Sequence, residues 1–193
     1  MLLAEQAITL LRNAGYQVKP VASRGLDHGV WAPLSLMYPA ADIPVFQVSL
    51  IAGGSPRDHY RYGSTLQSLR KQGVLVVSSG SLTHNLYEFM GHEKEDGALG
   101  SVTDFENWIA EALVDGRYED LMNYRRLAPY GKQNHPTDEH LLPLYFALGA
   151  AGERAKPMRL HSSHTYGVLS MDAYFFIEDA TEQYAGDLIG DNA

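Results

Sequence analysis

The strand–helix–strand pattern between residues 43 and 77 constrains the fold of this chain most. Residues 43–51 read Ile-Pro-Val-Phe-Gln-Val-Ser-Leu-Ile, and residues 74–77 form an unbroken apolar run, Val-Leu-Val-Val. Both stretches favour strands, and an amphipathic helix closed by Gly73 is expected over residues 57–72. Two strands joined by a helix pair in parallel through a right-handed crossover. The pattern therefore predicts an α/β fold: a single three-layer domain with a mostly parallel central sheet and helices on both faces.

Further elements are expected on both sides of this unit. The helical spacing of apolar residues predicts a helix from Leu2 to Asn13. Weaker patterns predict strands over residues 16–22 and 168–177, and helices over residues 104–113 and 118–124. A last helix, apolar and buried, is expected to begin with Thr137 as its N-cap. Residues 1–193 are interpreted as one domain, in which residues 178–193 form a flexible tail.

Composition and charge restrict the possible partners. The 193 residues carry a formal net charge of −8, and no run of basic side chains is longer than Arg125-Arg126. This argues against nucleic acid and against an anionic membrane surface as partners. No apolar run approaches the roughly 20 residues that cross a bilayer. The start of the chain lacks the basic segment of a signal peptide, so a cytoplasmic location is expected.

The chain has no cysteine, which excludes disulfides, thiolate metal sites and a cysteine nucleophile. Any metal must therefore be held by histidine and carboxylate side chains, a donor set that suits non-heme Fe(II), Mn(II) or Zn(II). Three of the eight histidines stand apart in glycine- or turn-rich settings and could converge on one ion: His28, His84 and His140. A further histidine that is not a ligand could then move protons.

Each of these histidines also has a purely structural interpretation. His84 lies where a site is expected, beyond the carboxyl end of a strand, but it could equally cap its own loop. Asp27 could orient the ring of His28, but the two could equally form a half-exposed turn. His135 and His140 could simply pack beneath the loop before the last helix.

Three other histidines give a weaker metal signal. His161 and His164 are separated by two residues, a spacing that is compatible with metal binding but common by chance. His92 has Glu93 and Glu95 close by, a pattern more typical of a solvated charged loop.

Five segments occur in the order in which one known family carries them. They are Arg24-Gly-Leu-Asp-His28-Gly-Val-Trp31, Met37-Tyr-Pro-Ala-Ala-Asp-Ile-Pro-Val-Phe-Gln-Val-Ser-Leu50, Ser79-Gly-Ser-Leu-Thr-His84-Asn-Leu86, His135-Pro-Thr-Asp-Glu-His140-Leu-Leu-Pro-Leu144 and Tyr166-Gly-Val-Leu-Ser-Met171. Together they resemble the class III extradiol ring-cleavage dioxygenases of the 4,5-DOPA dioxygenase type, also called LigB-like. The resemblance extends from about Leu2 to Phe176.

The resemblance implies an oxidoreductase of aromatic compound metabolism. Such an enzyme opens a catechol-type ring, as in a DOPA-like substrate, beside its two hydroxyls with dioxygen. The implied cofactor is Fe(II), with Zn(II) as the alternative. His84 and His140 match metal-ligand positions of the family, whereas the implied catalytic residues are His28 and His135. The implied substrate-binding residues are Asp27, His28 and Asn85.

The sequence departs from the family pattern at its start, so the expected catalytic domain is N-terminally short. Family members begin with a strand ending in His-Gly-Ser-Pro and later carry a Ser-Ala-His-Trp segment, and each supplies one metal-site histidine. Neither segment occurs in this sequence. The alternative function is therefore a truncated, catalytically inactive relative that acts as a binding or oligomeric partner; a zinc hydrolase is a third possibility. Exposed sheet edge and apolar surface would favour a homo-oligomer.

Overall fold

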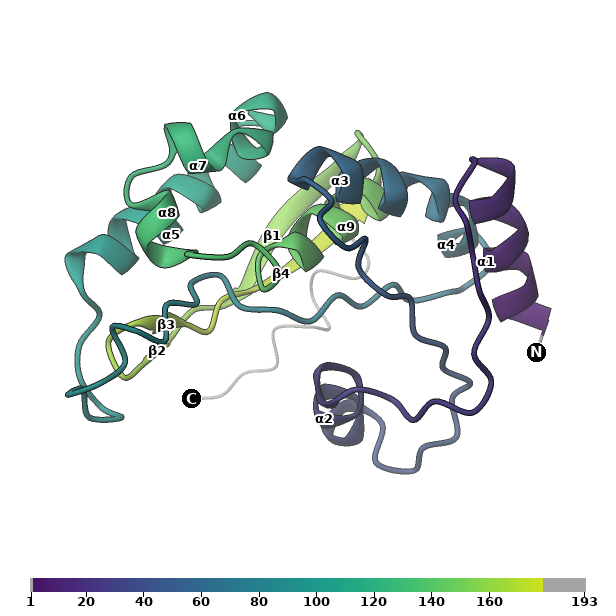
Figure 1. The fold of residues 1–193 in the computed structure, drawn as a ribbon, viewed down its shortest axis with the longest axis horizontal. Coiled ribbons are helices and arrows are strands. Elements are labelled where there is room, and N and C mark those ends of the chain that lie inside the picture. Colours follow the sequence, from purple (N-terminus) through teal and green to yellow (C-terminus); the bar gives the residue numbers. More distant parts are fainter. Residues whose placement is uncertain (1, 179–193) are drawn as a thin grey trace.

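The computed structural model describes residues 2–178, in which helices predominate (Figure 1). The helices are α1 (Leu2–Asn13), α2 (His28–Met37), α3 (Pro56–Thr65), α4 (Gln67–Arg70), α5 (Gly100–Val114), α6 (Tyr118–Met122), α7 (Tyr124–Leu127), α8 (Gly131–Asn134) and α9 (Leu142–Ala151). The strands are β1 (Ala155–His161), β2 (His164–Thr165), β3 (Leu169–Ser170) and β4 (Ala173–Glu178). Across residues 2–178, no helix combines the length and the apolar character that a membrane span requires.

Two hydrophobic clusters form the core. The larger one gathers buried side chains of α5 and α9, among them Phe105, Ile109, Tyr145 and Leu148. The smaller one gathers side chains of α1, α3 and α4, including Leu11, Tyr62, Leu66 and Leu69. Phe146 of α9 packs against this smaller cluster as well. Helix α9 therefore joins the two clusters.

Helices α3 and α9 pack main chain against main chain. A Cβ atom on Gly63 would overlap the carbonyl oxygen of Phe146, and a Cβ atom on Gly149 would overlap the carbonyl oxygen of Tyr60. Only glycine permits this approach, because any side chain would push the two helices apart. The approach buries most of α9, whose residues are apolar on all sides.

The predicted mostly parallel sheet is not observed within residues 2–178. There the sheets are two-stranded and antiparallel, β1 with β4 and β2 with β3. Residues 43–51 and 74–77, predicted as strands, form no ladder. A strand needs the hydrogen bonds of a neighbouring strand, and no described segment pairs with either stretch.

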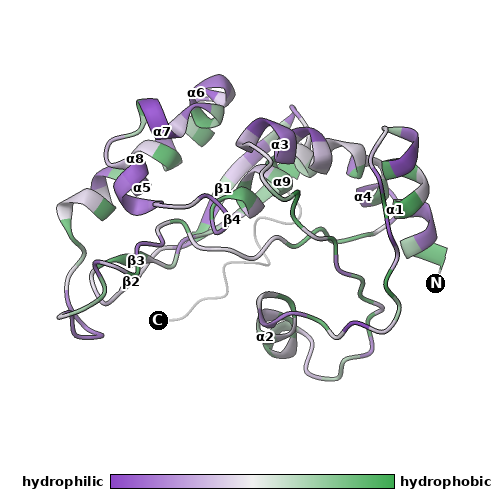
Figure 2. Ribbon diagram, viewed as in Figure 1, coloured by the Kyte–Doolittle hydropathy of each residue, from purple (hydrophilic) through white to green (hydrophobic). Residues whose placement is uncertain are grey.

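The side chains of these two stretches nevertheless keep an inward and an outward set. Phe46, Val48 and Val74 pack against the smaller cluster, whereas Val45 and Leu75 are exposed. Figure 2 shows apolar residues along the tubes that enter α3 and leave α4. The two stretches therefore keep one side toward the core, although the strand pairing is absent within residues 2–178.

Helix α2 is also less packed than its sequence indicates. Its residues read His-Gly-Val-Trp-Ala-Pro-Leu-Ser-Leu-Met, yet none of them is buried. In Figure 1 it stands apart from the layers formed by the other helices and the strands. Trp31, Leu36 and Met37 are exposed, whereas Val30, Ala32, Pro33 and Leu34 are half-buried.

Helix prediction was accurate for part of the chain. The helix expected from Leu2 to Asn13 is α1. The helix expected over 104–113 is the core of α5, and the one over 118–124 is divided into α6 and the start of α7.

Other predicted boundaries need correction. Residues 16–22 form no strand, and the expected strand over 168–177 is divided into β3 and β4. The helix expected over 57–72 is divided at Leu66 into α3 and α4. The tail predicted for residues 178–193 lies, apart from Glu178, outside the described residues.

The last helix begins five residues later than Thr137, at Leu142. Pro143 explains the shift, because proline lacks an N–H and is tolerated only in the first turn of a helix. His140 consequently lies in the turn before α9 rather than in its first helical turn.

Candidate metal centre

His84 lies in a loop that is fixed by hydrogen bonds around it. Its backbone N–H donates to the carbonyl oxygen of Asn134 at 2.9 Å. The preceding residue, Thr83, is fully buried; its hydroxyl donates to the carbonyl oxygen of Val168 at 2.9 Å and accepts the N–H of Ser170 at 2.7 Å. The loop therefore holds the histidine in one place, which a metal ligand requires.

His140 is brought to this loop by a close approach of main chains. A Cβ atom on Gly80 would overlap the carbonyl oxygen of His140, and the N–H of Ser81 donates to that same oxygen at 2.9 Å. Because Gly80 has no side chain, the segment that leads to His84 can pass directly against the turn before α9. Two distant parts of the sequence meet at this point.

The imidazole rings of His84 and His140 are stacked, with centroids 3.5 Å apart and 12° between the ring planes. Burial, and secondly the neighbouring His140, lower the pKa of His84 below its ordinary value. The ring is therefore neutral near pH 7 and keeps a lone pair. The Nδ1 atom of His140 is buried, and within the described residues it has no hydrogen-bond partner.

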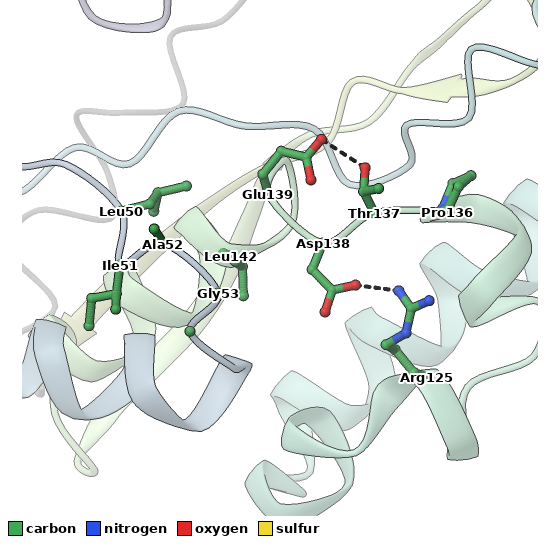
Figure 3. A pocket seen from close by; sticks show the side chains of 11 residues that line it. Leu50, Ile51, Ala52, Gly53, Arg125, Pro136, Thr137, Asp138, Glu139 and Leu142 are labelled. Atoms are coloured by element: carbon green, nitrogen blue, oxygen red, sulfur yellow. Dashed lines mark hydrogen bonds and ion pairs between the residues drawn. The ribbon is translucent and has the colours of Figure 1, made fainter.

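A cavity of about 490 Å³ adjoins the turn that carries His140 (Figure 3). Residues 50–54 line one side of it, and residues 136–139 with Leu142 and Arg125 line the other. Thr137 donates to the carboxylate of Glu139 at 2.7 Å, and this bond holds the pKa of Glu139 below its ordinary value. The same carboxylate lies 3.6 Å from Nδ1 of His140. The cavity thus has an apolar wall and a charged rim, and Glu139, rather than either histidine of the pair, is its lining residue next to His140.

His135, predicted as catalytic, lies in the hydrophobic core. Its ring is fully buried against the rings of Phe105 and Tyr124, and its Nε2 donates to the carbonyl oxygen of Leu82 at 2.7 Å. Burial lowers its pKa to about 4, so the ring is neutral. Through Leu82 it supports the loop that presents His84.

The predicted residues of α2 do not reach the histidine pair. His28 is exposed and forms no hydrogen bond, ion pair or ring contact with His84 or His140 in the part of the chain that the structure describes. Asp27 pairs with Arg24 at 2.8 Å and accepts a hydrogen bond from Gln47. The Arg24 hydrogen bond is the main reason why the pKa of Asp27 is lowered.

Asn85 is buried next to His84, but its amide is engaged within the loop. Its nitrogen donates to the carbonyl oxygen of Gln133 at 2.7 Å, and its oxygen accepts the N–H of Tyr87 at 3.1 Å. The structure therefore brings together His84, His140 and the main chain of Asn85, and leaves His28 and Asp27 at a separate helix.

The remaining histidines are paired elsewhere. Nε2 of His164 lies 2.8 Å from the buried carboxylate of Glu106. His92 lies 3.3 Å from Asp96, and His161 contacts Ser163 at 2.7 Å. None of these three histidines contacts the stacked pair.

An ion pair that sequence inspection missed holds the turn before His140. Arg125 is paired with Asp138 and donates to the carbonyl oxygen of His135 at 2.8 Å, and the hydroxyl of Tyr124 donates to Asp138 at 2.8 Å. Asp138 was interpreted as a first-turn residue of a helix, so its basic partner had no signal in the sequence. Only the fold brings Arg125 to it.

His59 was also missed, because nothing in its surrounding sequence marks it. It is fully buried; its Nδ1 donates to the carbonyl oxygen of Ser55 at 2.9 Å, and its Nε2 accepts the N–H of Ile51 at 3.1 Å. It thereby fixes the loop of residues 51–55, which forms one wall of the cavity.

The imidazoles of His84 and His140 are suitable ligand types for a divalent metal, but two are fewer than such a metal site needs. Two imidazoles lie together, and one of them has a buried nitrogen without a partner. Non-heme iron sites use about three protein ligands. Across residues 2–178, no group of three or more histidine, aspartate or glutamate side chains is arranged to hold an ion. Within residues 2–178 the stacked pair of His84 and His140 therefore falls short of such a ligand set.

Comparison with known proteins defines the class to which this fold and site belong. The family model described as the catalytic LigB subunit of aromatic ring-opening dioxygenase matches residues 1–177. The chain belongs to the LigB family of aromatic ring-opening dioxygenases, as the resemblance of its motifs implies.

Individual relatives carry a more specific name than the family description. The chain is similar to "4,5-DOPA dioxygenase extradiol" of Beta vulgaris, with 41% identity over 90% of this chain and 65% of that protein. It is 38% identical to the protein of the same name in Mirabilis jalapa, over 90% of this chain and 65% of that one. The chain thus spans about 65% of the length of these curated relatives.

A solved structure supports the fold. The crystal structure of uncharacterized protein JW3007 from Escherichia coli K12 superposes with a TM-score of 0.79 at 31% identity. The match covers 89% of this chain and 70% of that one. The arrangement of helices and strands is therefore shared with a solved structure.

Proposed function

We propose that the chain serves as a non-heme metal-dependent extradiol dioxygenase that opens a catechol-type ring, in a DOPA-like substrate, with dioxygen. The observation that carries the proposal is the stacked pair of His84 and His140 beside the cavity. The names of the relatives from Beta vulgaris and Mirabilis jalapa supply the reaction class. The family resemblance implies Fe(II) as the metal, with Zn(II) as the alternative, and imidazole ligands suit both.

In this proposal the two stacked imidazoles hold the metal. His84 is neutral because its pKa is lowered, and His140 has the free buried nitrogen. When bound, the metal would bring dioxygen and the catechol hydroxyls together and polarise them for ring opening. The Arg125–Asp138 ion pair and the ring of His135 keep the two ligands in position.

The cavity would receive the aromatic ring. Its apolar side chains, Leu50, Ile51 and Leu142, suit the ring, and Thr137 and Glu139 suit the hydroxyls. The residue proposed to take a hydroxyl proton is His28, with His135 as the second candidate and Asp27 and Asn85 as substrate-binding residues. A Cβ atom on Gly29 would lie 3.4 Å from the hydroxyl of Ser79, so the start of α2 adjoins the segment that leads to His84.

Several wider expectations belong to the same proposal. The proposal includes a small-molecule substrate and a cytoplasmic location, and the net charge of −8 argues against nucleic acid and an anionic membrane as partners. The unpaired stretches 43–51 and 74–77 would be strands of a mostly parallel sheet if partner strands were added, and their exposed side chains support a homo-oligomer. The whole of residues 1–193 would act as one catalytic domain.

The alternative function is a catalytically inactive relative that acts as a binding or oligomeric partner. One observation favours it: the histidine pair supplies two ligands where about three are needed. A metal held by two ligands would bind weakly and would leave the catechol poorly placed.

Metal content per chain, measured on protein purified without chelator, separates the two functions. We expect near-stoichiometric iron or zinc in the wild type and a loss of roughly tenfold or more in His84→Ala and in His140→Ala. His161→Ala is the matched control, because this histidine is exposed and its side chain is hydrogen-bonded to Ser163 rather than to the pair. Anaerobic Fe(II) loading followed by DOPA and dioxygen would then give the ring-opened product. Metal that is absent from the wild type, or unchanged in both variants, contradicts the catalytic function.

A further inference from the structure

A second cavity, of about 510 Å³, is formed by α7, α8 and the turn that joins them. Its lining comes from one stretch of chain, residues 125–133, so the unpaired stretches 43–51 and 74–77 contribute nothing to it. In Figure 1 the two helices lie with α5 at the end of the molecule opposite α1. Neither His84 nor His140 lines this cavity, which is therefore distinct from the candidate metal centre.

Close packing fixes the shape of this cavity. Tyr130, in the turn, has a left-handed conformation with φ of 54°. A Cβ atom on Gly131 would lie 2.8 Å from the carbonyl oxygen of Tyr124, so only glycine lets α8 pass this close to α7. On its other side α8 is anchored to α5, because the buried amide of Asn134 donates to the carbonyl oxygen of Ser101 at 2.8 Å. The basic side chains of α7 and α8 are thereby held around a common cavity.

The cavity is strongly positive. Three of its lining side chains are basic, Arg125, Arg126 and Lys132, and no carboxylate lines it among the described residues. Asp138 compensates the charge of Arg125 through their ion pair (Figure 3). Within residues 2–178, the side chains of Arg126 and Lys132 form no hydrogen bond and no ion pair. Two uncompensated positive charges at a concave surface attract an anion, in a chain whose net charge is −8.

The rest of the lining is uncharged. Ala128 is buried, and the ring of Tyr130 is 49% exposed. Gln133 donates its amide to Glu88 at 2.9 Å, and Glu88 itself does not line the cavity. A ligand would therefore meet two cations, a small apolar surface and one aromatic ring.

We propose that this cavity binds a phosphate group, either inorganic phosphate or the phosphate of a small monoester. The forked guanidinium of Arg126 can donate to two phosphate oxygens, while Lys132 supplies a point charge. A phosphate group carries a charge of about −1.5 to −2 at pH 7, which matches the two uncompensated cations. A single carboxylate would compensate only one of them. The exposed ring of Tyr130 would contact the organic part of a monoester.

Calorimetric titration of the full chain with inorganic phosphate, at constant ionic strength in chloride, tests the site. We expect saturable binding in the wild type and binding weaker by roughly tenfold or more in R126Q/K132Q. The matched control is R61Q/K71Q, which removes the same charge from two exposed basic residues elsewhere and should bind as the wild type does. Circular dichroism verifies that both variants keep their helices.

Two further titrations identify the ligand and separate this site from the metal centre. Phenyl phosphate that binds more tightly than inorganic phosphate assigns the site to a monoester, and equal or weaker binding assigns it to phosphate itself. His140→Ala should still bind phosphate, because His140 does not line the cavity.

Several results would overturn the proposal. A wild type without saturable binding, or an R126Q/K132Q variant that binds as tightly as the wild type, excludes the site. Equal weakening in R61Q/K71Q would mean that phosphate responds to the overall charge of the chain rather than to this cavity. Binding that is lost in His140→Ala would place the phosphate at the metal centre instead.

Discussion

Helices α9 and α2 are both ten residues long and both apolar, yet their environments are opposite. Seven residues of α9 are buried, whereas none of α2 is. Helix α9 packs against α3 so closely that a Cβ atom on Gly63 would overlap the carbonyl oxygen of Phe146. Helix α2 has no such partner in the described residues. Burial of an apolar helix is favourable, but it also requires another element with a complementary surface. Helix α9 has this in α3, and α2 does not among the described residues.

The same comparison explains the candidate site. His140 lies two residues before the buried helix α9, which fixes its position. Its ring stacks on the ring of His84. His28 is the first residue of α2 and is exposed with it. The resemblance assigns both histidines to one site, and the packing of their helices separates them.

The largest expected contrast comes from truncating one leucine on each helix. Leu148 of α9 is 2% exposed, and Leu148→Ala should lower the free energy of unfolding by about 3 kcal/mol, because it removes buried methyl groups and leaves a cavity. Leu36 of α2 is 86% exposed, and Leu36→Ala should change the free energy of unfolding by less than about 0.5 kcal/mol. Urea denaturation measures both. Similar losses at the two positions would mean that α2 is buried in solution.

A glycine pair gives the next contrast. Gly149→Ala forces a methyl group against the main chain of α3 and should destabilise the protein by about 2.5 kcal/mol. Gly29→Ala in α2 meets only the hydroxyl of Ser79, at 3.4 Å, and should stabilise the protein by up to about 1 kcal/mol through a lower helix entropy cost. Thermal unfolding of the two variants, with wild type beside them, measures the signs. A stabilising Gly149→Ala would contradict the close packing of α3 and α9.

The smallest expected effect is the pH dependence of the free energy of unfolding that the buried His135 causes. His135 is buried and neutral with a pKa of about 4, whereas the unfolded chain binds a proton near pH 6.5. As pH falls from 6.5 toward 4, His135 binds a proton in the unfolded state but not in the folded state. The free energy of unfolding therefore decreases. The expected loss is about 2 kcal/mol between pH 7 and pH 5. His135→Gln, whose amide can still donate to Leu82, should show a shallower pH dependence over the same range, and an unchanged slope would contradict the assignment.

The fold was predictable from sequence where local pattern decides it. Helix α1 matches its predicted bounds because its apolar spacing and the Gly15 that follows are local signals. The apolar helix near the end was located, but its start was missed because Pro143 outweighs the cap signal of Thr137. Residues 43–51 and 74–77 show the limit of pattern: both were predicted as strands, and neither is paired within residues 2–178, since pairing depends on a second segment.

For the candidate site, the sequence nominates residues but does not give their geometry. Motif resemblance identified His84 and His140, but their stacking depends on the main-chain contact at Gly80, which no spacing rule reveals. The burial of His135 follows from the rings of Phe105 and Tyr124, which are distant in sequence from one another. Such contacts require the fold itself.

The stacking of His84 on His140 has a spectroscopic consequence. Each ring lies in the shielding region of the other, since the centroids are 3.5 Å apart and the planes nearly parallel. The ring protons of both residues should therefore resonate upfield of those of His161, which is exposed. A proton NMR spectrum of the metal-free chain would thus report the assembly of the loop and the turn through two displaced signals, before any metal or substrate is added.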